Sequence, residues 1–198
     1  MPQAVQNYSP QTAQIEQVKR LAFVAWSAIA FVVLLWLALI VAPPFLQANN
    51  FAAAAKTIYL VFSFVCHQIN ERAFHLFEHP FAVCARCFGV YAGLAAGVLL
   101  YPLFRTIYDT QPLPRIVLLA APIPTTIDFA LGYFDIWENT HFSRFFTAAI
   151  LGIACAFFVV PGVVEIMRFV FLKKLKTAFP IVPRTDAPSD YSRPDLRI

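Results

Sequence analysis

Long apolar segments dominate the chain. The first, residues 21–42 (LAFVAWSAIAFVVLLWLALIVA), has no charged residue and is longer than the about 20 residues that a helix needs to cross a bilayer. Three more apolar segments cover residues 88–104, 116–134 and 145–167. The pattern predicts four transmembrane helices, with the third interrupted by two prolines.

The first apolar run is too long for the core of a cleaved signal peptide, and it stops at Pro43 and Pro44. It is therefore expected to be a retained helix. The segment 51–65 (FAAAAKTIYLVFSFV) is shorter and carries Lys56. We expect it to be a short interfacial or half-inserted helix, and a fifth span is the alternative. The expected fold class is an all-α integral membrane protein with four transmembrane helices and this short helix.

Composition supports a membrane protein. Of the 198 residues, 60% are hydrophobic and 13% are charged, whereas soluble domains carry about 25% charged residues. We expect a cytoplasmic N-terminal segment at 1–20, a helical membrane domain at 21–176 and a disordered cytoplasmic tail at 177–198. That tail is rich in proline, aspartate and arginine.

Lysine and arginine are distributed unevenly between the two sides of the predicted bundle. Cytoplasmic loops are enriched in these residues, and four spans with an internal N-terminus place most of them inside. The inside set is Lys19, Arg20, Arg105, Arg115, Arg168, Lys173, Lys174, Lys176, Arg184, Arg193 and Arg197. The outside set is Lys56, Arg72, Arg86 and Arg144. The sequence thus predicts a multi-pass protein of the cell membrane with both termini in the cytoplasm.

The net charge of +4 reflects this topology. The chain shows no nucleic-acid-binding motif, so the lipid bilayer is the expected partner and nucleic acid is not. A fifth span would move the lysines at 173–176 to the outside, against the charge rule.

Residues that can bind metals gather on the predicted outer side. These are three of the four cysteines and all four histidines, namely Cys66, Cys84, Cys87, His67, His75, His79 and His141. Cys155 lies alone in the last span and is expected to fill space in the core. His75 and His79 are expected to be surface residues.

Cys84 and Cys87 form a C-x-x-C at the start of the second span, and Cys66 and His67 precede it by a gap of sixteen residues. A helix start favours thiolate over thiol. The spacing predicts a tetrahedral site, suited to zinc, made by Cys66, His67, Cys84 and Cys87. An oxidising compartment leaves two alternatives open: a thiol–disulfide exchange pair or an inert structural bridge.

Asp128 lies within the third apolar segment, where a carboxylate is costly and normally has a partner. We expect it to pair with an arginine, Arg144 in preference to Arg86. Asp128 and Glu138 are candidate catalytic proton acceptors. Arg72, Arg86 and Arg144 are candidate contacts for an anion or phosphate.

Gly89, Gly93 and Gly97 recur every four residues after Cys84. Such a stripe of small residues allows another helix to approach closely in lipid. It predicts either a tightly packed neighbour or the contact of a homo-oligomer or a larger membrane complex.

The motifs CHQINERAF, VCARCFGVYAG, PIPTTID and ENTHFSRFFTAAILG together resemble a family of small bacterial membrane proteins, domain of unknown function 2085. The resemblance covers residues 66–152 and implies a membrane protein with a Cys/His cluster, but no particular reaction. The positions that fit are Cys66, His67, Gln68, Arg72, Cys84, Arg86, Cys87, Gly89, Tyr91, Gly93, Asp128, Glu138, Thr140, Arg144 and Thr147. Phe129, Asn139, His141 and Ala148 depart from the family pattern.

Three functions remain open from the sequence. The first is a membrane protein with an outward metal site, which as an enzyme would be a hydrolase of a lipid-borne substrate. The second is a membrane thiol–disulfide oxidoreductase. The third is a non-catalytic accessory subunit of a larger membrane complex.

Overall fold

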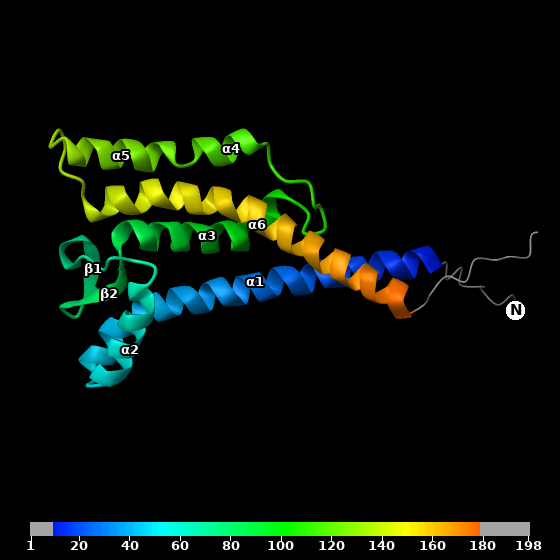
Figure 1. Cartoon of the computed structure of the whole chain (residues 1–198), viewed down its shortest axis with the longest axis horizontal. Coiled ribbons are helices and arrows are strands. Elements are labelled where there is room, and N and C mark those ends of the chain that lie inside the picture. The colour runs from blue at the N-terminus through cyan, green and yellow to red at the C-terminus, as the bar shows by residue number, and fades with distance from the viewer. Residues whose placement is uncertain (1–9, 179–198) are drawn as a thin grey trace, which may run out of the picture.

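The structure is a computed structural model that describes residues 10–178, so the predicted tail lies outside the described residues from position 179 onward. Figure 1 shows long helices running along one common axis, with a short helix and a β-hairpin gathered at one end. The helices along this axis are α1 (Pro10–Ala48), α3 (Ala85–Phe104), the consecutive pair α4 (Arg115–Ala120) and α5 (Ile123–Tyr133), and α6 (His141–Ala178). The helix at the end of the bundle is α2 (Ala52–Ser63).

Four segments are long and apolar enough to cross a membrane: Ile15–Ala48, Ala85–Phe104, Arg115–Tyr133 and His141–Phe171. The predicted four helices and the additional short apolar helix are therefore confirmed. The predicted break in the third span is also present, since α4 and α5 are separated at Ala121 and Pro122.

The first helix continues past the point where the sequence suggested an end. Pro43 and Pro44 lie inside α1, which runs on to Ala48, and both prolines are fully buried. Proline dihedrals are compatible with a helix, and neighbouring elements can compensate the lost hydrogen bonds in a membrane bundle. The extra turn carries the chain over to α2.

The glycine stripe of α3 packs against α6 of the same chain. A Cβ at Gly89 would overlap the backbone of Phe145, one at Gly93 the backbone of Ala149, and one at Gly97 would meet the Ala156 side chain. The two helices run in the same direction, as Figure 1 also shows. The expected oligomer contact through Gly89, Gly93 and Gly97 is therefore wrong, because these glycines are already covered by α6.

A buried cluster joins α1 to this helix pair. Trp26 donates its indole N–H to the carbonyl oxygen of Val98 at 2.8 Å. Tyr101 and Val160 are fully buried beside it. The cluster holds α1 antiparallel to α3 and α6.

A β-hairpin between α2 and α3 was not predicted. The strands β1 (Ala73–Leu76) and β2 (His79–Cys84) pair antiparallel. Phe77 and Glu78 form the connection, both with positive φ, as in the two-residue turns that match strand twist. The sequence lacks the Asn-Gly type of signal for such a turn, so the segment resembled a loop.

The hairpin and α2 lie at the end of the bundle where α1 ends and where α3 and α6 begin (Figure 1). We call this the cysteine end, because Cys66, Cys84 and Cys87 lie there. All four histidines also belong to elements at this end. The first residues of α1 and the last of α6 lie together at the opposite end.

The contact between α3 and α6 gives a first prediction. Gly93→Ala should lower the free energy of unfolding by about 1–3 kcal/mol, since the added Cβ forces the helices apart. Gly162→Ala is the matched control, because nothing lies within 4 Å of a Cβ added there. Thermal unfolding in detergent should show a lower Tm for the first variant and an unchanged or higher Tm for the second. Equal melting of both variants would contradict the packing.

Candidate metal centre

Three different elements bring the cysteines together. Cys66 follows the end of α2, Cys84 is the last residue of β2 and the N-cap of α3, and Cys87 lies in the first turn of α3. The hairpin makes this possible, because β2 returns the chain to the loop that holds Cys66.

The three sulfur atoms lie within 4.8 Å of one another, and the Sγ atoms of Cys84 and Cys87 are 3.5 Å apart. Zinc–sulfur bonds of about 2.3 Å in a tetrahedron place sulfurs about 3.8 Å apart. A disulfide needs about 2.05 Å. The observed separation is close to that of sulfurs sharing one metal ion.

Backbone N–H groups point at the sulfur of Cys66. The N–H of Cys84 donates to it at 3.3 Å and the N–H of Gln68 at 3.5 Å. The Cys84 and Cys87 thiols and these two N–H groups lower the pKa of the Cys66 thiol well below its usual value, although burial acts the other way. Cys66 is therefore suited to be a thiolate.

Gln68 holds the loop that carries Cys66. Its side-chain N–H₂ donates to the carbonyl oxygens of Tyr59 in α2 and Ala82 in β2, both at 2.8 Å. Its backbone has a φ of 51°, a left-handed conformation that turns its own N–H toward Cys66. Gln68 is thus a positioning residue, and the sequence motif pointed to it without revealing its role.

Apolar packing also holds the loop that carries Cys66. Cys66 is 6% exposed and belongs to a buried cluster with Ile40, Phe62, Ala82 and Val83. The candidate centre therefore lies beside a well-packed apolar cluster to which α1, α2 and β2 all contribute.

The predicted histidine ligand is placed differently from the cysteines. His67 is exposed, and among the described residues the close group of potential ligands contains only the three cysteines. His67 nevertheless lines the same cavity as they do. His75 makes contacts of 3.0 Å with Ala73 O and 3.2 Å with Asn70 Oδ1, which gives it a local structural role.

A cavity of about 190 Å³ opens beside the sulfurs. Its walls include the three cysteines and all three arginines that the sequence singled out, Arg72, Arg86 and Arg144. These arginines, the sequence-based candidates for contacts with an anion, therefore border the same cavity as the cysteines, and their role as anion contacts stays a prediction.

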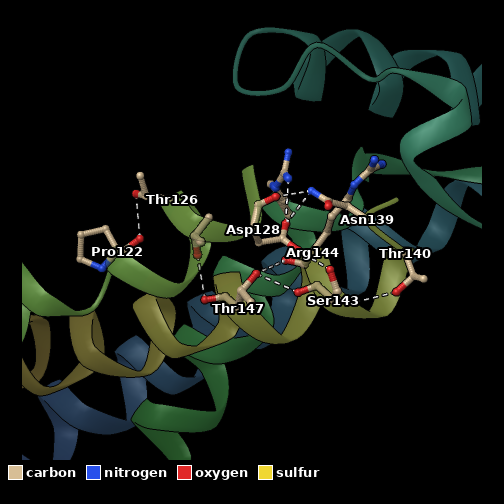
Figure 2. A network of polar contacts seen from close by, with 10 residues as sticks. Pro122, Thr126, Asp128, Asn139, Thr140, Ser143, Arg144 and Thr147 are labelled. Atoms are coloured by element: carbon tan, nitrogen blue, oxygen red, sulfur yellow. Dashed lines mark hydrogen bonds and ion pairs between the residues drawn. The ribbon is translucent and has the colours of Figure 1, made fainter. Parts of the chain in front are cut away.

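Asp128 is the centre of a polar network (Figure 2). It is 8% exposed, and its Oδ2 accepts from Arg86 Nη2 at 2.8 Å and from Asn139 Nδ2 at 3.2 Å. Its Oδ1 accepts from the hydroxyl of Ser143, and its backbone oxygen accepts from Asn139. The network ties α5 to the first turns of α3 and α6.

The expected preference of Asp128 for Arg144 is wrong, because the ion pair forms with Arg86. The expectation that α5 and α6 are neighbours was right, as Thr125 also donates to Thr147 O at 2.8 Å. Successive helix residues point about 100° apart, so Ser143 faces Asp128 and Arg144 turns away toward the cavity. Sequence reasoning also missed Asn139 and Ser143.

The two catalytic candidates do not lie free beside the sulfurs. Both carboxylate oxygens of Asp128 are engaged in the network, and Asp128 does not line the cavity. Glu138 is exposed and lines a separate cavity with Glu71 and Asp135. The arrangement can therefore hold a metal ion, but among the described residues no unengaged carboxylate lines the cavity beside it.

Four apolar helices and a cysteine cluster at one end define a small multi-pass membrane protein with a candidate metal centre. A family model described as "Predicted membrane protein (DUF2085)" matches residues 66–158. The chain belongs to this family, whose matched region begins at Cys66 and includes the whole candidate centre.

Two relatives match the chain. "Uncharacterized protein MJ1492" of Methanocaldococcus jannaschii is 36% identical over 104 residues, which is 52% of this chain and 67% of the relative. An "Uncharacterized protein" of Methanothermobacter thermautotrophicus is 35% identical over 95 residues, 48% of this chain and 84% of the relative. Both organisms are archaea, whereas the resemblance pointed to a bacterial family. No solved structure matches the chain.

The network around Asp128 gives a second prediction. Asp128→Asn should lower the free energy of unfolding by about 1.5–3 kcal/mol, because Arg86 loses its charged partner. Adding Arg86→Gln should recover part of this loss. Arg144→Gln is the control partner, since Arg144 makes no hydrogen bond or ion pair with Asp128, and its coupling to Asp128 should be much weaker. Denaturation of the single and double variants measures these couplings, and recovery with Arg144→Gln instead of Arg86→Gln would contradict the assigned pair.

Proposed function

We propose that this protein binds a divalent metal ion, zinc, through the thiolates of Cys66, Cys84 and Cys87 at the end of its helix bundle. The observation that carries the proposal is the convergence of three sulfur atoms within 4.8 Å from three separate elements. Zinc accepts three thiolates and a fourth ligand in a tetrahedron.

The surroundings of Cys66 support a metal rather than an inert thiol. Two N–H groups reach its sulfur, and hydrogen bonds around ligands of this kind orient them and tune the metal. Buried thiols that only fill space need no such donors. The first turn of α3 adds the positive end of its helix dipole near Cys84 and Cys87.

A fourth ligand could approach the three sulfurs from the cavity beside them. His67 borders it and follows Cys66 directly, so it is the protein side chain available as fourth ligand. Water is the alternative, and a site with three protein ligands and one open position is typical of catalytic zinc. His67→Ala distinguishes a histidine ligand from a water ligand. If His67 is the fourth ligand, the substitution weakens zinc binding, and if water is the fourth ligand, zinc binding stays unchanged.

Thiol–disulfide exchange is the second candidate function. The 3.5 Å between the sulfurs of Cys84 and Cys87 is favourable for it, because a small side-chain movement would allow a bond. Cys66 would then be the third thiol that attacks the disulfide. This candidate predicts a reducible bond in the purified protein and no bound metal.

The proposal includes the topology. Both termini are expected in the cytoplasm of the cell, with the cysteine end on the outer face. The distribution of eleven lysines and arginines against four supports this orientation. The cysteine end of the bundle carries the smaller, outer set.

Metal content provides the third prediction. The purified protein should contain one zinc ion per chain by elemental analysis. Cys66→Ser, Cys84→Ser and Cys87→Ser should each remove the zinc and lower the Tm by similar amounts, because the binding energy of the ion also stabilises the fold. Cys155→Ser is the matched control and should keep the zinc, since Cys155 lies in α6 away from the cluster.

Two outcomes would contradict the ligand set. Cys66→Ser with full zinc content would remove Cys66 from it. Two thiols hidden in a reducible bond, with no zinc, would replace the proposal by the exchange function.

Thiol accessibility provides the fourth prediction. After metal removal, a membrane-impermeant maleimide should label Cys84 or Cys87 in intact cells. A cysteine introduced by Arg115→Cys, at the start of α4 on the predicted inner side, should react only after the membrane is opened. The reverse order of labelling would overturn the proposed orientation while leaving the metal centre untouched.

A further inference from the structure

We infer that the cavity beside the three sulfurs is a binding site for a phosphate group, held by the guanidinium groups of Arg72 and Arg144. The inference goes beyond metal binding, because it depends on the arginines and requires no metal ion.

The cavity has the character of an anion site. The residues that line it include three arginines and no aspartate or glutamate. Its volume of about 190 Å³ is below the roughly 300–1,000 Å³ of pockets for drug-sized ligands. A small anion or the head group of a larger molecule therefore suits it better than a bulky organic ligand.

The charges around the cavity do not balance. Arg86 is neutralised by Asp128, with which it forms an ion pair. In the described part of the chain, neither Arg72 nor Arg144 forms an ion pair. Three thiolates and one divalent metal ion would leave a single negative charge, so two unpaired arginines give an excess of positive charge within the lining of this cavity. Arg144 also borders the second cavity with Glu71, Asp135 and Glu138, but it forms no ion pair with them.

Arg144 is held in an unusual position. It is half-buried, and its Nε atom is buried with no hydrogen-bond partner. Arg86 and Arg72 are close enough to repel it, and this repulsion exceeds the weaker attraction by Asp128 and Cys84. Burying a cation beside two others is unfavourable, and a bound anion is the direct way to offset this cost. The guanidinium fork binds phosphate oxygens in pairs.

The helix arrangement adds to the same field. Because α3 and α6 run in the same direction, both begin at the cysteine end. Arg144 lies in the first turn of α6 and Cys87 in the first turn of α3. The partial positive charges at the N-termini of α3 and α6 add to the positive charge of the arginines around the cavity.

A phosphate group can come from two sources. Free inorganic phosphate can enter from water. The phosphate of a lipid can enter with its apolar part against Val65 and Ile69, which line the cavity and are 47% and 39% exposed. The recognising chemistry is the same in both cases, so the experiment has to distinguish the sources.

The test is titration calorimetry of the full chain in a phosphate-free detergent, as purified and after metal removal. One arm uses inorganic phosphate and the other a short-chain phosphatidic acid, with short-chain phosphatidylcholine as the head-group control. Binding of inorganic phosphate identifies the free anion as a ligand. Binding of phosphatidic acid alone identifies a lipid phosphomonoester.

Arg72→Gln and Arg144→Gln should each weaken the binding of the phosphate probe about tenfold or more, as expected for one charged hydrogen bond. Arg115→Gln is the matched control at the start of α4 and should bind like the unaltered protein. Arg72 is exposed, so its substitution spares the fold and keeps the test valid if Arg144→Gln is unstable.

The inference is overturned if the protein binds neither probe, or if both arginine variants bind as tightly as the unaltered protein. Zinc content is read in parallel. Absence of zinc with intact phosphate binding would refute the metal proposal alone, and zinc without phosphate binding would refute the phosphate site alone.

Discussion

The close contact between α3 and α6 is the constraint on which the rest of the structure depends. Gly89 and Gly93 let the backbone of α6 approach α3, and Gly152 does the same from the other side. In lipid, such packing replaces the hydrophobic effect as the force that holds helices together. Because the contact is parallel, it aligns the first turns of both helices, and these turns carry Cys87, Arg86 and Arg144. A change of register between the two helices would separate the sulfurs from Arg144.

The hairpin and the polar network complete the site from opposite sides. The hairpin brings Cys84 to the loop of Cys66, and Gln68 joins that loop to α2 and β2 through both of its amide hydrogens. The network around Asp128 fixes Arg86 and thereby the wall of the cavity. Cysteine sulfurs, unpaired cations and helix N-termini thus meet in one small volume at one end of the bundle. This combination suits a metal ion and an anionic ligand bound side by side.

The sequence was sufficient for those features that follow from composition and spacing. Long apolar runs predicted the four helices, since a bilayer demands a minimum length. The clustering of Cys66, Cys84 and Cys87 was predicted from the four-span arrangement, because that arrangement places all three cysteines on the same side of the helix bundle. The hairpin was missed because Phe77 and Glu78 adopt positive φ without the usual turn residues. Arg86 was ranked below Arg144 because Arg144 is closer to Asp128 in the sequence. The orientation of α6 about its axis instead directs Ser143, the residue before Arg144, toward Asp128. Such orientations depend on packing between helices, which a single sequence does not encode in any local pattern.

The central claim is that the three cysteines hold one metal ion together. X-ray absorption at the zinc edge of the purified protein tests this directly, because it counts the sulfur atoms bound to the metal. Three sulfur neighbours at about 2.3 Å and one nitrogen or oxygen neighbour at about 2.0–2.1 Å are expected. A zinc ion with no sulfur shell, or with fewer than three sulfur neighbours, would contradict this claim.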